Sequence, residues 1–120
     1  MNYRALVCLA LIHTLVDCFS QFVSPLWPSL ETELHLAPWV ISILFAAWQL
    51  GASISQPLFG YLGDRFDTHL AVVFGPGVAI VCLTLIGFAT GPVSLGLLLA
   101  IGGLGIGAFH PEAAVGVVQA

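Results

Sequence analysis

Four ionisable side chains lie in stretches that are otherwise apolar enough to cross a lipid bilayer. His13 and Asp17 are four residues apart in LIHTLVDCFS, and His110 and Glu112 flank Pro111 in GAFHPEAAV. An aspartate at the centre of a membrane helix costs about 2.5 to 3.5 kcal/mol on insertion scales. Ionisable residues inside membranes therefore usually face a cavity and mark the path of an ion, a proton or a substrate.

The spacing of His13 and Asp17 suits proton chemistry. One helical turn separates them, so the imidazole and the carboxylate can share a hydrogen bond or a proton. Histidine titrates near neutral pH, as a group that gains and loses a proton during transport must do. We expect the pair to form a proton-coupling or substrate-binding element. The alternative is a self-satisfied polar pair that holds two helices together.

Polar residues also follow one face of each of the first two apolar stretches. In the first stretch this face holds His13, Asp17, Ser20 and Ser24. In the second it holds Ser42, Gln49, Ser53 and Gln56. With a rise of 1.5 Å per residue, His13, Asp17 and Gln49 lie about 12 to 18 Å from their helix starts. That depth is the midplane of a core about 30 Å thick, so Gln49 is predicted to face the same cavity.

GAFHPEAAV adds a proline beside two ionisable groups. Pro111 cannot donate a backbone hydrogen bond and should free the carbonyl of Gly107, which predicts a kink. Broken helices beside polar groups form binding sites in transporters. For Glu112 the alternative is a hydrated helix end at the lipid headgroups. A metal site from His13, His110 and Glu112 has little support from the spacing, so neither a metal nor another cofactor is expected.

The elements that must position these groups are four apolar stretches, at about 5–28, 38–62, 70–89 and 93–120. About 20 mainly apolar residues span the hydrocarbon core. Prolines in SPLWPSL are expected to end the first helix, and Pro38 is well placed to start the second. Gly103 and Gly107 form a GxxxG spacing that allows close helix contact. The sequence predicts an all-α integral membrane protein with four transmembrane helices.

The composition supports this class and excludes others. The chain has 120 residues, of which 59% are hydrophobic and 7% charged, whereas soluble domains carry about a quarter charged residues. Arg4 and Arg65 are the only strong bases, too few to bind nucleic acid. No nucleophile–base pair has catalytic spacing, so an enzyme is not expected. Both arginines fall on the same side of the predicted helices, which predicts a cytoplasmic N-terminus.

Three segments resemble one family of transporters. GYLGDRFDTH is similar to G-x-L-x-D-R-x-G-R-R, the loop signature between helices two and three of the major facilitator superfamily. The matching positions are Gly60, Leu62, Asp64 and Arg65. Asp67 replaces the usual glycine, and Thr68 and His69 replace the basic pair. HTLVDCFSQFVSPLWPSL and GGLGIGAFHPEAA resemble the fosmidomycin-resistance type of efflux transporter within that superfamily.

The resemblance implies a proton-coupled efflux antiporter for small drugs or metabolites in the plasma membrane, expected to be a bacterial inner membrane. It implies a central cavity or proton path at His13, Asp17, His110 and Glu112. It also implies a cytoplasmic gate at Gly60, Leu62, Asp64 and Arg65. The expected partners are membrane lipid, protons, a small-molecule substrate and the remaining helices of a longer transporter.

Family members consist of two six-helix halves, each built from inverted three-helix repeats. Residues 1–120 would then be a partial N-terminal transmembrane domain that contains the first repeat and the start of the second. Two alternatives remain open at this point. One is a complete four-helix multidrug pump that acts as a dimer, with Asp17 as the shared carboxylate. The other is a truncated membrane fragment without transport activity.

Overall fold

The structure is a computed structural model that describes residues 2–66 and 71–119, with side chains described at all of these except 71, 72, 112 and 116–119. Every regular element in these two ranges is a helix, which confirms the predicted all-α class. In chain order they are α1 (Tyr3–Gln21), α2 (Val23–Glu33), α3 (Pro38–Arg65), α4 (Ala71–Leu85), the short 3₁₀ helix η1 (Ile86–Phe88) and α5 (Pro92–Gln119).

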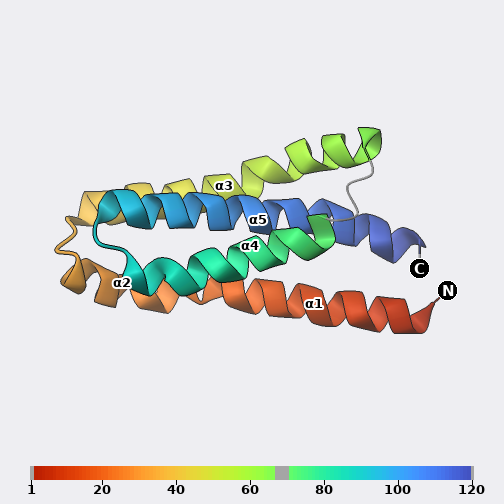
Figure 1. Ribbon diagram of the computed structural model, residues 1–120, viewed down its shortest axis with the longest axis horizontal. Coiled ribbons are helices and arrows are strands. Elements are labelled where there is room, and N and C mark those ends of the chain that lie inside the picture. The colour runs from red at the N-terminus through yellow and green to blue at the C-terminus, as the bar shows by residue number, and fades with distance from the viewer. Residues whose placement is uncertain (1, 67–70, 120) are drawn as a thin grey trace.

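The helices form an elongated bundle of 51 × 27 × 18 Å. Figure 1 shows α1 and α2 as one long rod, with α3, α4 and α5 running alongside it and both termini at the same end. Within the described residues, three segments are long and apolar enough to cross a membrane: Tyr3–Glu33, Pro38–Arg65 and Pro92–Val115. The remaining apolar helix, Val73–Phe88, is shorter. A multi-pass membrane bundle follows from these lengths and compositions.

The first helix does not end where the sequence predicts. The chain leaves α1 at Phe22, resumes as α2 at Val23 and stays helical through Pro28 to Glu33. Pro25 explains the interruption, because its ring would clash with the carbonyl of Gln21 in a continuous helix. Membrane helices tolerate such local adjustments, so Pro25 interrupts the helix and Pro28 lies within it, and neither proline ends it. At the end of α2, His35 adopts a φ of 50° and turns the chain towards α3.

Helix α5 is the centre of the bundle and packs far more extensively on α3 and α4 than on α1 (Figure 1). Its side chains Leu95, Leu99 and Phe109 are completely buried. Because lipid tails are as apolar as leucine, such helices associate through close packing rather than through the removal of apolar surface from water. Large apolar residues on the outer faces, such as Leu11 and Leu15, remain exposed. In a membrane these side chains would contact lipid tails.

Small residues make this packing possible on both sides of α5. Towards α3, a Cβ atom added to Gly103 would lie 3.0 Å from the carbonyl oxygen of Trp48, and one added to Gly107 would collide with the hydroxyl of Ser55. Towards α4, a Cβ on Gly105 would lie 2.6 Å from the carbonyl oxygen of Gly75. The backbones are therefore in direct contact, and the GxxxG pair lies at the α3–α5 contact.

Candidate functional site

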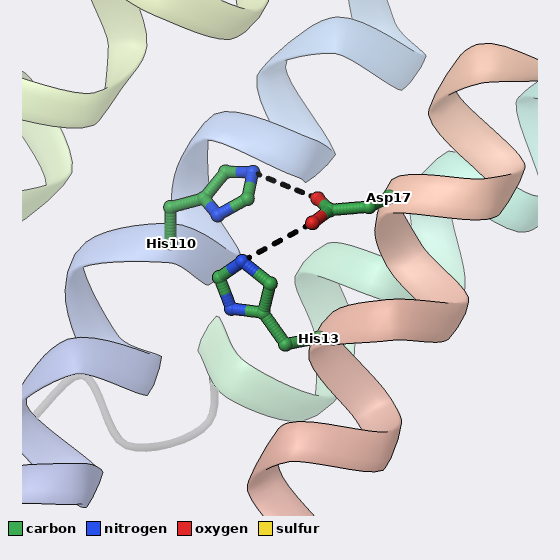
Figure 2. Close-up of side chains that lie close together, drawn as sticks. All are labelled: His13, Asp17 and His110. Atoms are coloured by element: carbon green, nitrogen blue, oxygen red, sulfur yellow. Dashed lines mark ion pairs between the residues drawn. The ribbon is translucent and has the colours of Figure 1, made fainter.

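Three titratable side chains converge where α1 meets α5. His13 Nε2 lies 3.3 Å from Asp17 Oδ2, and His110 Nε2 lies 3.9 Å from Asp17 Oδ1. Figure 2 shows the two imidazoles, one from each helix, both directed at the single carboxylate of Asp17. The two rings also meet edge to face, with their centroids 5.0 Å apart. One carboxylate thus holds together two helices that are far apart in the sequence.

The local helical geometry positions each of these groups. His13 and Asp17 are neighbours on α1 because they are one turn apart. His110 follows Phe109, whose fully buried ring lies 5.7 Å from the ring of His13, measured between centroids. Phe109 therefore fixes the rotation of α5 about its axis, and that rotation directs His110 towards α1.

The three side chains are only partly covered by the rest of the described chain. The exposed fractions of the side chains are 46% for His13, 51% for Asp17 and 23% for His110. Each carboxylate oxygen of Asp17 lies near one imidazole nitrogen, while half of the Asp17 side chain stays accessible. The cluster can therefore exchange protons or bind an ion. A fully enclosed ion pair would do so only slowly, because protons and ions could not reach it readily.

A cavity of about 240 Å³ opens beside Asp17 and His110. Helices α1, α2, α3 and α5 contribute its wall, and most of its polar groups are amides and hydroxyls. The polar lining residues are Asp17, Ser20, Gln21, Ser24, Gln49, Ser53, Gln56 and His110. Phe45, Trp48 and Ile106 add apolar surface. The cavity can therefore hold a small molecule with both polar and apolar parts.

On its other side the cluster borders a second cavity of about 520 Å³ with a mainly apolar lining. His13 and His110 line this cavity together with Leu6, Leu9, Ala10, Ala113 and Ala114. The imidazole pair thus separates a polar cavity from an apolar one. Asp17 lines only the polar cavity, so the carboxylate faces the side where a charged or polar molecule would bind.

Four of the predicted cavity residues are therefore close together: His13, Asp17, Gln49 and His110. The fifth, Glu112, lies on α5, but its side chain lies outside the described residues. Sequence reasoning missed the apolar part of the cavity. Phe45 and Trp48 precede Gln49 by four and one positions, so the helical periodicity of α3 was the available signal.

Pro111 lies inside α5 and does not end it, because the helix continues to Gln119. The kink at Pro111 stays a prediction, and Pro111 also lies beside α3. A Cβ atom added to Gly60 would lie 3.7 Å from the Cβ atom of Pro111. This separation is an ordinary van der Waals contact, so the end of α3 lies beside α5 next to the histidine cluster.

The predicted gate residues lie near the C-terminal end of α3, which extends three residues beyond the predicted end at Leu62. Gly60 and Leu62 are partly buried there, whereas Asp64 and Arg65 are exposed. The guanidinium carbon of Arg65 lies 4.9 Å from the centre of the Tyr61 ring. The remaining positions of the signature, at 67–69, lie outside the described residues.

Comparison with known proteins agrees with the family resemblance found in the sequence. Residues 9–119 match a family model described as Major Facilitator Superfamily. The chain is 27% identical to the Fosmidomycin resistance protein of Escherichia coli (strain K12) and 26% identical to the Multi-drug resistance efflux pump PmrA homolog of Lactococcus lactis. It is 25% identical to the Uncharacterized MFS-type transporter YfnC of Bacillus subtilis.

Each of these three matches covers 92% of this chain but 27% of the relative. The chain thus spans about a quarter of the length of the curated relatives it matches. No solved structure matches the chain.

Proposed function

The chain belongs to the major facilitator superfamily of membrane transporters, and on that premise we propose that it forms part of a proton-coupled exporter of small molecules. The names of two relatives, a resistance protein and an efflux pump, support export as the direction of transport. The family consists of transporters rather than enzymes, in agreement with the lack of a catalytic constellation in the sequence.

The observation that carries the proposal is the convergence of His13, Asp17 and His110 beside a polar cavity. Among the side chains described around the 240 Å³ cavity, Asp17 and His110 are the only titratable ones, and His13 contacts Asp17 from outside the cavity wall. The lining that α3 contributes holds amides and hydroxyls but no charge. A proton that enters this region therefore has the three-residue cluster as its binding site.

Antiport requires that the substrate and the proton do not occupy the site together. The geometry suits this requirement, because both depend on the same carboxylate. When a substrate with a positive or hydrogen-bond-donating group approaches Asp17, it competes with a proton for the carboxylate oxygens. Gln49, on the facing wall of the cavity, supplies an uncharged group that orients the substrate whether or not Asp17 is protonated.

The size of the cavity supports a role for further helices in the longer transporter. Pockets for small molecules usually measure about 300 to 1,000 Å³, so a cavity of about 240 Å³ is small for a drug-sized substrate. We propose that residues 1–120 are part of the N-terminal transmembrane domain and that the remaining helices complete the substrate site. Membrane lipid covers the apolar outer faces.

The topology of the bundle supports a plasma-membrane orientation with a cytoplasmic N-terminus. Figure 1 places the start of α1 and the end of α3 at the same end of the bundle, so Arg4 and Arg65 lie on the same side. Positive residues favour the cytoplasmic side. The gate residues Gly60, Leu62, Asp64 and Arg65 would then control access from the cytoplasm, in a bacterial inner membrane.

The test uses the full-length protein in a bacterium that lacks its own drug exporters. Growth on a panel of antibiotics identifies a transported drug, and pH-driven uptake of that drug into inverted membrane vesicles measures coupling. We expect Asp17→Asn to abolish pH-driven uptake, because an amide at this position cannot take up and release a proton as a carboxylate does. We expect His13→Ala to reduce it less, since His110 still faces the carboxylate.

Glu31→Gln is the matched control, because it removes an exposed carboxylate near the end of α2, outside the cavity. It should transport as the unmodified protein does. Normal pH-driven uptake by both Asp17→Asn and His13→Ala, at normal expression, would eliminate the proposed proton site.

A further inference from the structure

We propose that His13, Asp17 and His110 bind a divalent transition-metal ion, with Zn²⁺ as the ion that best fits the donors. One ligand atom from each residue lies within 4.8 Å of the other two. The spacing along the chain did not predict this site, because His110 is far from α1 in the sequence. Asp17, and not Glu112, is the carboxylate that the fold brings to the two histidines (Figure 2).

The distances between the donor atoms are close to those of a zinc site. Zinc binds nitrogen and oxygen at about 2.0 to 2.2 Å in tetrahedral geometry, which places neighbouring donor atoms about 3.3 to 3.5 Å apart. His13 Nε2 and Asp17 Oδ2 already lie 3.3 Å apart, whereas His110 Nε2 lies 3.9 Å from the other oxygen, Asp17 Oδ1. With one donor atom from each residue, all three lie within 4.8 Å of one another. Small rotations of partly exposed side chains would bring the third donor to the required distance.

The types of donor decide which ions fit. Imidazole nitrogen suits zinc, copper, iron and nickel, whereas magnesium and calcium prefer sites made only of oxygen. Three protein ligands leave a fourth position of zinc free, as in sites where the ion binds water or an exchanging ligand. Asp17 lines the polar cavity, so the free position can be reached from there.

The electrostatic surroundings also favour a cation. Asp17 supplies one negative charge, and the described lining of the polar cavity contains neither lysine nor arginine. The two strong bases of the chain, Arg4 and Arg65, belong to the first turn of α1 and the last turn of α3. No lysine or arginine side chain in the described lining therefore opposes binding of a divalent ion.

A bound ion would hold α1 against α5, which pack less closely on each other than α5 packs on α3 and α4. It would also occupy the nitrogen and oxygen atoms that the proposed proton site uses. We therefore expect Zn²⁺ to inhibit pH-driven transport. This expectation rests on the proposed function, whereas binding of the ion does not.

Binding is tested on the purified full-length protein, without any transport measurement. Titration with Co²⁺ should produce the visible absorption bands of a tetrahedral cobalt site, and calorimetric titration with Zn²⁺ should give one ion for each chain. His13→Ala and His110→Ala should each weaken Zn²⁺ binding by more than about tenfold, because even groups that only support a ligand change affinity by about 10- to 100-fold. His35→Ala, which removes an exposed histidine outside the cluster, should bind as the unmodified protein does.

His110→Cys is the control for misfolding, because it replaces one zinc ligand by another. Cysteine thiolate is itself a zinc ligand, so this variant should bind Zn²⁺ and add a sulfur-to-cobalt charge-transfer band to the Co²⁺ spectrum. Absence of cobalt bands from the unmodified protein, or unchanged zinc affinity in both alanine variants, would overturn the metal site. Zinc binding by a protein that does not transport would instead contradict the proposed function and leave the metal site standing.

Discussion

Helix α5 presents two different kinds of surface to its neighbours. Towards α3 and α4 its glycines allow backbone to touch backbone. Towards α1 the contact is looser and centres on partly exposed titratable groups (Figure 2). Phe109 and His110 are adjacent in the sequence, yet Phe109 is completely buried with its ring beside His13 of α1, whereas His110 is partly exposed.

The contacts of α5 with α3 and α4 hold the bundle together, whereas its contact with α1 carries the groups that can bind protons, ions or substrates. Close packing resists displacement, because any shift either opens a void or creates a clash. A contact made by three partly exposed polar side chains can be broken and remade as protons, ions or substrates bind. The α1–α5 contact is therefore the place where we expect this part of the protein to change during transport.

The sharpest test of this comparison is the adjacent pair Phe109 and His110. Phe109→Ala leaves a cavity, and such changes cost about 3 to 5 kcal/mol in soluble cores. We expect the largest loss of thermal stability in detergent from this variant. His110→Ala should lose pH-driven transport with only a small change in stability. Equal losses of stability in the two variants would show that the buried ring contributes no more to stability than the partly exposed imidazole.

The glycine contact provides the second test. Gly105→Ala places a methyl group 2.6 Å from the carbonyl oxygen of Gly75, so the helices must separate. Overpacking of this kind costs about 1 to 3 kcal/mol, which should lower the melting temperature. Gly77→Ala is the matched control, because nothing lies within 4 Å of its Cβ position on α4. A melting temperature equally low in the control would contradict the packing argument.

On the polar side, Gln49→Leu should affect substrate binding more than stability. The change removes an amide from the cavity wall, and one hydrogen bond contributes about 0.5 to 1.5 kcal/mol. We therefore expect the KM for the transported drug to rise about 2- to 10-fold. Ser42→Ala is the control on the same helix, since the exposed Ser42 hydroxyl donates to the carbonyl of Pro38 outside the cavity. A similar KM in Gln49→Leu and the control would remove Gln49 from the substrate site.

The smallest effect is expected at the exposed end of α3, where Tyr61 and Arg65 are both exposed. Tyr61→Leu removes the ring that Arg65 covers, and an exposed contact between a cation and a ring contributes about 0.5 to 1 kcal/mol. Tyr61→Phe keeps the ring and should melt as the unmodified protein does. If Tyr61→Phe were as destabilised as Tyr61→Leu, the phenol hydroxyl rather than the ring would be responsible.

Much of this organisation could be predicted from the sequence because it depends on local periodicity. The apolar stretches predicted the helical class, and the spacing of His13 and Asp17 predicted their contact. The end of the first helix could not be predicted in the same way, because a helix can pass a proline when neighbouring residues adjust. Whether the helix would end at Pro25 or Pro28 depended on how the neighbouring residues and helices satisfy the freed backbone groups.

The sequence by itself determined that the chain is a membrane bundle, because composition and helical spacing limit what such a chain can bury. It also determined which face of each helix carries polar groups. Only the tertiary structure decided which of these faces meet. The pairing of His110 with Asp17 depends on how α5 is rotated and how deeply it lies against α1, and the buried ring of Phe109 and the glycine contacts set both. No pattern in a single helix contains that information.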